Sequence, residues 1–256
     1  MDLSQLSAYV LTFNEEDNIR KCLEHLSWAK KVVVVDSGST DQTSEIVNEF
    51  SNAKLVTRSF DNHRNQHEFA LSLLNSPWVL RLDADWLVSK ALLDEIEALN
   101  LEPNIGGYRI PFHFSIHGEL VPINLYPPVT ALFRRQGARY VQDGHTERLM
   151  PKGEVAACLA PLIHEDKKSI DRFLQSQIKY SKLEFEKFSA PSKTPQHWKT
   201  RIRATPGLAP LLVAIYLLVF RGGLFRGQVS WHYILQKIIA ECALSLRLLD
   251  EKIKKR

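Results

Sequence analysis

The sequence predicts an α/β protein with a mostly parallel central sheet, helices on both faces of that sheet, and a helical C-terminal appendage. Val32–Val35 is a run of four β-branched residues, apolar on both sides, which suits a strand buried in the middle of a parallel sheet. Strand-like and helix-like segments alternate on either side of this run. After the linker Ala190–Pro195, rich in helix breakers, the composition changes. We therefore expect one domain over residues 1–190 and a helical region over residues 191–256.

The spacing of apolar residues supplies the individual elements of the first half. It predicts strands over Ser7–Phe13, Val32–Val35, Lys54–Arg58 and Trp78–Leu82. A helix is expected after each strand. The first two helices show helical spacing of apolar residues, at Ile19, Cys22, Leu23 and Leu26 and at Ile46, Val47 and Phe50, and the other two are expected over Asn62–Leu74 and Lys90–Leu99. Ser39 or Asp41 would cap the helix that follows the valine strand.

After Pro103 the regular alternation ends. We expect strands over Gly107–Phe114 and Val129–Arg135, then a polar stretch, Arg139–Leu149, that is dense in ionisable groups. The spacing predicts a long helix over about Ser169–Phe188 and a last amphipathic helix near the C-terminus.

Composition bounds the function only loosely. The chain has 256 residues, 45% hydrophobic and 24% charged, which is ordinary for a globular protein. Its formal net charge of +4 is too small to argue for a nucleic-acid partner. The three cysteines, Cys22, Cys158 and Cys242, are scattered, so no disulfide framework or thiolate metal site is indicated, and a reducing compartment is expected. No signal peptide is visible at the start.

Polar residues follow three of the predicted strands where each strand ends. Asn14, Asp36 and Asp83 should meet at one edge of the sheet, because the carboxyl ends of parallel strands converge there. The turn after Asp36 is made of small and acidic residues, and the free amides of the helix that follows would favour an anion such as a diphosphate. Ordinary turn chemistry also explains such a sequence, so both interpretations stay open at this point.

A second acidic residue, Asp85, follows Asp83 at a spacing of two. In extended backbone both carboxylates can point to the same side. Two oxygen donors at a strand terminus form a modest Mg²⁺ or Mn²⁺ site, which leaves room for substrate phosphates. The alternative is again a turn, for which Asp-Ala-Asp is well suited.

Taken together, three stretches resemble a known family of enzymes. VLTFNEEDNIRKCL, VVVVDSGSTDQT and WVLRLDADW, in this order and spacing, resemble the inverting glycosyltransferases of the GT-A fold (glycosyltransferase family 2). The likeness is closest to small bacterial members that build lipopolysaccharide core and other surface glycans. It covers residues 6–85 with specific motifs and extends more loosely to residue 188.

The resemblance implies a set of roles for these residues. A nucleotide-diphosphate sugar would bind over the sheet edge, and one divalent ion would bridge its diphosphate to the Asp-x-Asp carboxylates. Asp85 would be the direct metal ligand, with Asp83 beside the ribose and the metal, and Asp36 would contact base or ribose. The nucleotide pocket would further be lined by Thr12, Asn14, Glu15 and Ser39.

The family usually supplies its catalytic base from the second half of the domain. Within Asp143-Gly144-His145-Thr146-Glu147, Asp143 is the first candidate and Glu147 the second. Glu147 would alternatively form a surface ion pair with Arg148. His145 would orient the acceptor or the phosphates.

Three further residues are candidates for the site. His164 would be a third metal ligand, or else a hydrogen-bonded structural histidine. Trp86 stands where these enzymes often carry another acidic residue, and its indole would stack on a sugar or pack against the loop. Arg64, near the start of a predicted helix, is a candidate contact of donor or acceptor.

The apolar run Leu208–Phe220 is the main feature of the C-terminal region. It is shorter than the roughly 20 residues of a transmembrane helix, and Pro210 interrupts it. It is flanked by cationic and Trp residues, namely Trp198, Arg201, Arg203, Arg221, Arg226 and Trp231. This pattern favours a helix lying in an anionic membrane surface, with Leu212 and Leu217 on its apolar side. A core helix, or an interface with a second subunit, is the alternative.

The sequence thus predicts a metal-dependent inverting glycosyltransferase. It would move a sugar from a nucleotide donor to a hydroxyl of a glycolipid or polysaccharide acceptor, in the cytoplasm at the inner face of the plasma membrane. A nucleotidyltransferase that makes sugar nucleotides is the competing enzyme class, but its first strand should run into a Gly-rich, Arg-containing loop, whereas this one runs into Phe13-Asn14-Glu15. A catalytically silent membrane-bound scaffold is the non-enzymatic alternative, and the intact aspartates argue against it.

Overall fold

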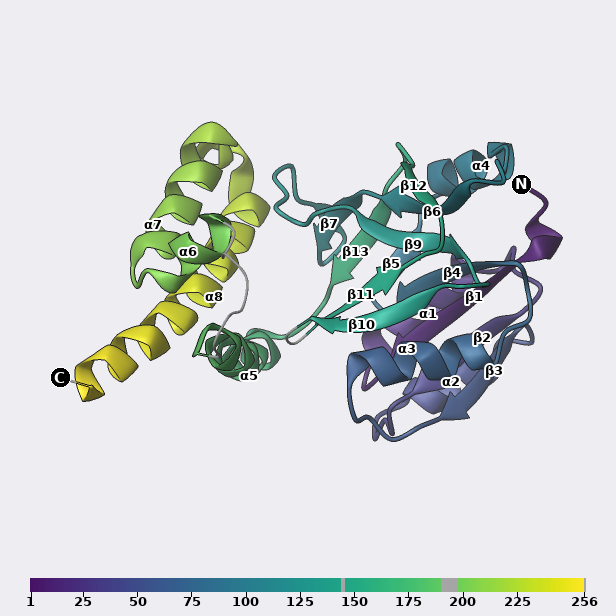
Figure 1. The fold of residues 1–256 in the computed structure, drawn as a ribbon, viewed down its shortest axis with the longest axis horizontal. Helices are drawn as coiled ribbons and strands as arrows, with labels where there is room; N and C mark the ends of the chain where they lie inside the picture. Colours follow the sequence, from purple (N-terminus) through teal and green to yellow (C-terminus); the bar gives the residue numbers. More distant parts are fainter. Residues whose placement is uncertain (144–145, 190–197, 256) are drawn as a thin grey trace. The chain divides into compact units, whose positions relative to one another are not determined.

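The computed structural model describes residues 1–143, 146–189 and 198–255, and Figure 1 shows the course of the chain. Two compact units are present. The first contains Met1–Gly118 and Asn124–Lys167, and the second contains Glu119–Ile123 and Lys168–Arg256. The compact units therefore divide before the long helix that the sequence pattern includes in the first domain.

The first unit is built on a seven-stranded sheet of order β12-β6-β9-β4-β1-β2-β3. Its strands are β1 (Leu6–Thr12), β2 (Val32–Asp36), β3 (Ala53–Thr57), β4 (Trp78–Asp83), β6 (Ile105–Ile110), β9 (Val129–Arg134) and β12 (Glu154–Ala157). Strands β1 to β4 are parallel, and β9 runs antiparallel to both β4 and β6. From β1 the chain order goes to β2 on one side and to β4 on the other, so a topological switch point lies at the end of β1. The predicted fold class is confirmed.

Helices cover both faces of this sheet. They are α1 (Glu16–Glu24), α2 (Thr43–Asn48), α3 (His63–Ser72) and α4 (Lys90–Ala98), after a short 3₁₀ turn, η1 (Leu3–Gln5). Val32 and Val34 pack into the core with α1, α2 and α4, while Val33 and Val35 pack into a second core with Ala70 of α3. The valine strand is thus buried on both faces, as its composition predicts.

A second, smaller sheet lies next to the first. It contains β5 (Trp86–Val88), β13 (Leu162–Asp166) and β7 (Phe112–Ile116), in which β13 runs antiparallel to β5 and parallel to β7. The single strand predicted over Gly107–Phe114 is wrong, because the chain breaks at Pro111 and passes from β6 in the large sheet to β7 in the small one. Proline has no amide hydrogen for a sheet, so it suits this transition.

The polar stretch 139–149 forms a hairpin. Its strands are β10 (Arg139–Asp143) and β11 (Thr146–Met150), and among the described residues they pair only with each other. The hairpin packs against α3 on the same side of the large sheet as Val33 and Val35.

In its described residues the second unit is mostly helical, and it also contains the two-residue strand β8 (Glu119–Leu120). It contains α5 (Ile170–Ser189), α6 (Trp198–Ala204), α7 (Leu208–Ile215), a π-helical turn η2 (Tyr216–Phe220), a 3₁₀ turn η3 (Gly223–Phe225) and α8 (Gly227–Lys254). Helix α8 packs against α5 and α7. Arg203 of α6 ties these helices together through ion pairs to Glu184 (3.0 Å) and Glu241 (3.1 Å).

The predicted apolar run 208–220 corresponds to α7 and η2. Leu217 is fully buried, so its assignment to a membrane-facing side is wrong, whereas Leu212 is exposed. An apolar run of this kind has few polar residues to mark its outer face, which is why the sequence pattern misplaces Leu217. No helix in the described part of the chain is long and apolar enough to cross a membrane.

Candidate active site

The carboxyl ends of β1, β2 and β4 bring the predicted residues together. Thr12 lies opposite Asp36 in the β1–β2 register, and Leu11 lies opposite Asp83 in the β1–β4 register. Asp36 and Asp83 therefore flank the end of β1 at nearly the same level. This is the edge at which doubly wound sheets bind ligands.

The loop after β2 is shaped by Asp36. This buried carboxylate accepts hydrogen bonds from the amides of Gly38 (3.1 Å) and Ser39 (2.9 Å) and from Ser39 Oγ (2.5 Å). Ser39 Oγ in turn accepts from the amide of Asn14 (2.8 Å), and Asn14 Oδ1 accepts from the amide of Thr40 (2.8 Å). The ends of β1 and β2 are thereby held as one structure, with Asn14 in the left-handed region at φ 54°.

The start of α2 differs in detail from the predicted cap. Gln42 is the N-cap residue and makes no side-chain cap, while Asp41 accepts from the amide (3.0 Å) and the hydroxyl (2.6 Å) of Thr43. Asp41 thus caps the start of α2 from the residue before the N-cap, whereas Ser39 binds Asp36 in the loop and does not cap the helix.

Two nucleotide-pocket candidates lie at the end of β1. Thr12 Oγ1 is buried and has no hydrogen-bond partner among the described residues. A buried hydroxyl without a partner is uncommon and suits a ligand contact. Glu15 is buried and accepts from Asn18 Nδ2 (2.7 Å), and its amide donates to Thr43 Oγ1 (2.9 Å).

The Asp-Ala-Asp turn comes close to His164. Register places His164 of β13 opposite Trp86 of β5, the residue after Asp85. As a result His164 Nε2 lies 3.2 Å from Asp85 Oδ2, and both side chains are largely buried. The imidazole is surrounded by the rings of Phe114 and Tyr126, with centroids 4.9 and 5.4 Å away.

Asp83 is short of compensating charge. Removal from solvent raises its pKa to about 7, the nearby Asp85 carboxylate adds to the shift, and Arg81 opposes it. In the described part of the chain no three His, Cys, Asp or Glu side chains form a complete metal cluster. The donors present nevertheless fit a hard divalent cation, which commonly takes one or two protein carboxylates and completes its shell with substrate oxygens.

The region of the predicted base is only partly described. Asp143 ends β10 and pairs with Thr146, but its side chain and the whole of His145 lie outside the described residues. Glu147 does not pair with Arg148 at the surface as the alternative supposed. Its side chain is only 9% exposed and accepts from Arg81 Nη1 at 2.6 Å. His67 Nε2 lies 3.2 Å from the same carboxylate oxygen.

Two other candidates are engaged in protein contacts. Trp86 is buried, its ring packs edge-on against Phe112 at 4.7 Å, and the Arg81 guanidinium lies over it at 5.5 Å. This favours the packing interpretation of Trp86 over sugar stacking. Arg64 pairs with Glu68 at the surface of α3, at 3.2 Å.

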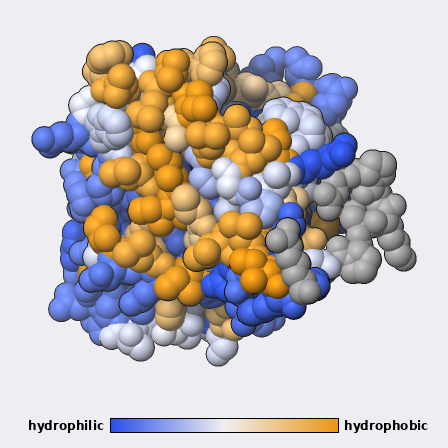
Figure 2. Space-filling model, turned by 90° about the vertical axis from the view of Figure 1, so that its left-hand side faces the viewer, coloured by the Kyte–Doolittle hydropathy of each residue, from blue (hydrophilic) through white to orange (hydrophobic). Residues whose placement is uncertain are grey.

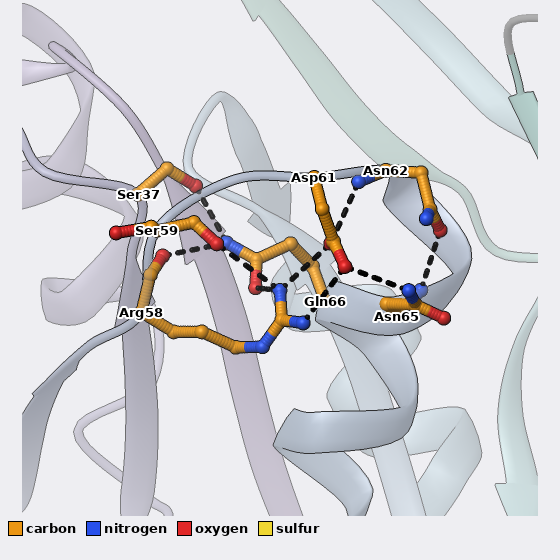
Figure 3. A network of polar contacts seen from close by, with 7 residues as sticks. All are labelled: Ser37, Arg58, Ser59, Asp61, Asn62, Asn65 and Gln66. Atoms are coloured by element: carbon orange, nitrogen blue, oxygen red, sulfur yellow. Dashed lines mark hydrogen bonds and ion pairs between the residues drawn. The ribbon is translucent and has the colours of Figure 1, made fainter.

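A polar network that the sequence analysis missed borders the Asp36 loop (Figure 3). Gln66 is buried, and its Nε2 donates to Ser37 Oγ (2.9 Å) while its Oε1 accepts from Arg58 Nη1 (2.6 Å). Arg58 also donates twice to Asp61, at 2.9 and 3.1 Å, which lowers the pKa of that carboxyl group. The position of these residues directly after β3 and at the start of α3 is the signal that would have found them.

A shallow pocket of about 470 Å³ lies on the other side of β13. It is lined by Asp17, Lys21, His117, Gly118, Glu165 and Lys167. Successive residues of a strand face opposite sides, so Glu165 points away from the face that carries His164. None of the residues predicted from the sequence lines this pocket.

Known proteins are similar to this chain over the stretch that contains these motifs. Residues 7–120 match the model of glycosyl transferase family 2. A lipopolysaccharide core biosynthesis glycosyltransferase, LpsC of Rhizobium meliloti, is 31% identical in an alignment of 235 residues that covers 88% of this chain and 84% of that protein. An uncharacterized glycosyltransferase of Rickettsia bellii is 36% identical over 105 residues, 41% of this chain and 35% of its own length.

Among solved structures, the mannosyltransferase PcManGT of Pyrobaculum calidifontis, in complex with GDP-Man and Mn²⁺, is similar in fold. Its TM-score is 0.55 at 17% identity, over 96% of this chain and 87% of that one. The sheet with its switch point, the aspartates at the strand ends and the match to LpsC along most of the chain lead to one conclusion. The chain belongs to glycosyl transferase family 2 and is a glycosyltransferase.

Proposed function

We propose that this glycosyltransferase moves a sugar, with inversion, from a nucleotide-diphosphate sugar to a hydroxyl of a glycolipid or polysaccharide acceptor of the lipopolysaccharide-core type. The observation that carries the proposal is the approach of His164 to Asp85, 3.2 Å apart, beside Asp83 at the switch point of the sheet. The likeness to LpsC supports the acceptor class.

In this proposal the donor nucleotide lies across the ends of β1 and β2. Asp36 and Ser39 hold the loop against Asn14, and the unpartnered Thr12 hydroxyl is available to the ligand. Glu15 completes the pocket from the start of α1. Removal of solvent at this edge strengthens each polar contact to the ligand.

Asp85, with Asp83 and His164, would hold Mg²⁺ or Mn²⁺. The ion, when bound, neutralises negative charge that develops on the departing diphosphate. Asp83 supports this arrangement, because a carboxyl group with a raised pKa gains from a nearby cation. The aromatic rings around His164 exclude water and fix the direction of its imidazole.

The proposed base is Asp143, which would accept the proton of the acceptor hydroxyl. Its place at the tip of the β10–β11 hairpin puts it on a separate element from the donor loop, as an attack from the opposite side of the sugar requires. Glu147 is a poorer candidate, because Arg81 and His67 already bind its carboxylate. His145 would orient the acceptor or its phosphates, and Arg64 stays a candidate substrate contact at the surface of α3.

The second unit is proposed to attach the enzyme to a membrane surface. Figure 2 shows hydrophobic side chains exposed together on the face that the C-terminal helices present. The turn from η2 to α8 has the most exposed of them, including Val219 (68%), Phe220 (75%) and Phe225 (87%), next to the exposed Arg221 and Arg226. Apolar tips with cationic neighbours suit an anionic lipid surface. Arg203, by contrast, is used in ion pairs inside the unit.

In this proposal the enzyme works in the cytoplasm at the inner face of the plasma membrane, where sugar nucleotides and a lipid-borne acceptor would meet. We assign catalysis to the region 1–190 and membrane attachment to the region 191–256, with α5 joining the two.

Donor turnover in an Asp85→Ala variant tests the proposal. Nucleoside diphosphate release from UDP-glucose, UDP-N-acetylglucosamine and GDP-mannose, with water taking the sugar in place of the acceptor hydroxyl, is measured with Mn²⁺, with Mg²⁺ and with EDTA. We expect at least about a hundredfold loss in the variant or in EDTA, because the charge on the leaving group is no longer stabilised. Asp94→Ala, which removes an exposed carboxylate of α4, is the matched control.

Thermal shifts with the same nucleotides check that Asp85→Ala is folded. Full turnover in EDTA or in Asp85→Ala would refute the metal assignment. Formation of pyrophosphate from a nucleoside triphosphate and a sugar phosphate would favour the nucleotidyltransferase alternative instead.

A further inference from the structure

The described strands of the β10–β11 hairpin contact the rest of the first unit through side chains rather than through a sheet ladder. Within the described residues its strands pair only with each other, so no ladder of backbone hydrogen bonds joins it to the large sheet. An isolated two-stranded hairpin is marginally stable in water. The contacts of its side chains with the sheet and with α3 therefore decide where its tip lies.

Part of this attachment is apolar. Tyr140 of β10 and Leu149 of β11 are buried in the core that also contains Tyr9, Val79 and Phe133. Apolar contact holds the hairpin against the sheet but is non-directional, so by itself it fixes orientation only loosely.

The directional part is a buried polar cluster from five elements. Glu147 Oε1 of β11 lies 2.6 Å from Arg81 Nη1 of β4 and 3.2 Å from His67 Nε2 of α3. His67 Nδ1 lies 2.8 Å from the hydroxyl of Tyr9, which is 2.6 Å from the hydroxyl of Tyr140. The side chains of Glu147, Arg81 and His67 are exposed by only 9%, 8% and 2%.

The partners of His67 define a consistent direction of donation. With a hydrogen on Nε2, neutral His67 donates to Glu147 and accepts from Tyr9 at Nδ1, while Tyr140 donates to Tyr9. The ring of Tyr140 also stacks on that of His67, with centroids 4.5 Å apart. One hairpin thus makes an ion pair, a hydrogen-bond chain and a ring stack with the rigid sheet and α3.

Arg81 connects this cluster to the candidate active site. It lies two residues before Asp83 on β4, and its guanidinium is also placed over Trp86, the residue after Asp85. Glu147 therefore binds to a group whose other contacts adjoin the Asp-Ala-Asp turn.

We propose that Glu147 is a positioning residue. Through its buried ion pair with Arg81 it fixes the β10–β11 hairpin, and with it the proposed base Asp143, relative to Asp83 and Asp85. This inference rests on the proposed function only for the role of Asp143. The attachment of the hairpin by the Arg81–Glu147 pair stands independently of the reaction.

The test is a set of three variants: Arg81→Met, Glu147→Leu and Glu147→Gln. The first two each leave one buried charge without its partner, whereas glutamine keeps the shape of the side chain and an oxygen that accepts from Arg81 Nη1. A positioning residue therefore tolerates the change to glutamine, but a group that takes a proton does not, because the amide has no basicity. The exposed pair Arg20–Glu49, changed in the same way, is the matched control.

Two quantities are measured for each variant. Hydrogen–deuterium exchange of a peptide covering residues 139–150 reports the attachment of the hairpin. Nucleoside diphosphate release from the three sugar nucleotides, with Mn²⁺, reports kcat and the donor KM. Because a displacement of about 1 Å can cost a hundredfold in rate, small loosening should be visible in kcat.

We expect Arg81→Met and Glu147→Leu to raise hairpin exchange and to lower kcat at least about tenfold, with the donor KM within about threefold of wild type. Glu147→Gln should keep most of the wild-type kcat and exchange. Should either of the first two variants fail to fold, the other is compared with Glu147→Gln by the same two measurements.

Two results would overturn the proposal. One is wild-type hairpin exchange in every variant. The other is a loss of about a hundredfold in kcat for Glu147→Gln with wild-type hairpin exchange, which would make Glu147 a chemical group. If the wild type releases nucleoside diphosphate from none of the donors, the proposed function fails, while the exchange measurement still decides the role of the pair.

Discussion

Replacing Phe220 and Phe225 by serine should release the protein from anionic membranes. Both side chains lie at the turn from η2 to α8, and they are 75% and 87% exposed. Arg221 and Arg226 stand next to them and are also exposed. The turn thus presents exposed apolar side chains with cationic neighbours in the sequence, and the two substitutions change it without touching the core of the second unit.

The size of the effect follows from the exposed fractions. Full burial of a phenylalanine side chain contributes about 1.5 to 3 kcal/mol. Scaled by 75% and 87%, the two rings together contribute about 2.5 to 5 kcal/mol when the tip enters the interface. Since each 1.4 kcal/mol is a factor of ten, the double variant should bind at least about fifty-fold more weakly.

Cosedimentation with vesicles measures this directly. Vesicles of phosphatidylglycerol and phosphatidylethanolamine are compared with neutral phosphatidylcholine vesicles at low and high salt. Arg221 and Arg226 should each add up to about 1 kcal/mol on the anionic vesicles, an increment that salt screens. High salt should therefore release the wild-type protein only in part, because the apolar contribution remains.

The controls separate membrane contact from folding. Leu159→Ser changes an 89% exposed side chain of the first unit and should leave vesicle binding unchanged. Leu217→Ser changes a fully buried side chain and should lower the melting temperature of the second unit. The reasoning is refuted if the Phe220/Phe225 double variant cosediments to the same extent as wild type, or if the wild-type protein does not cosediment with anionic vesicles.

Two further predictions concern the first unit. Asp36→Ala should weaken the binding of UDP or GDP at least about tenfold, because three hydrogen bonds that shape the loop are lost. Asp36→Asn should retain most of the affinity, and calorimetry measures both. Equal weakening in the two variants would show that the charge of Asp36, not the shape of the loop, matters. Burial lowers the pKa of His67 from 6.5 to about 4. Burial by itself would raise the pKa of Glu147, but the hydrogen bond from His67 and the charge of Arg81 lower it. The contribution of neutral His67 to the free energy of unfolding is therefore complete above about pH 6.5 and is lost as the pH falls toward about 4. Between these pH values, the free energy of unfolding measured with urea should fall less steeply in His67→Gln than in wild type.

The fold was predictable where one interaction dominates. A run such as Val32–Val35 has no polar side to turn toward water, so it fits only the middle of a covered sheet, and the neighbouring strands follow from it. The break at Pro111 was not predicted, because the apolar pattern continues across it and only the change of sheet reveals it. Leu217 shows the same limitation for helices, since an apolar run does not tell which of its sides is covered.

The site was predictable as far as it depends on strand ends. Asp36 and Asp83 are brought level by the register of parallel strands, which the sequence pattern implies. The approach of His164 to Asp85 depends on the antiparallel pairing of β5 with β13, which are far apart in the sequence. The contact of Arg81 with Glu147 likewise joins strands that are far apart in the sequence, and the sequence does not indicate which charged residue each of them will pair with.

A hairpin whose described strands pair only with each other behaves as an exchangeable part. Among the described residues, 139–150 can be replaced by a hairpin of different sequence without breaking a backbone ladder of the large sheet, provided that Tyr140, Asp143, Glu147 and Leu149 are kept. The strand ends that would bind the donor would remain intact under such a replacement. The hairpin is therefore a segment that protein engineering can vary separately from the strand ends of the large sheet.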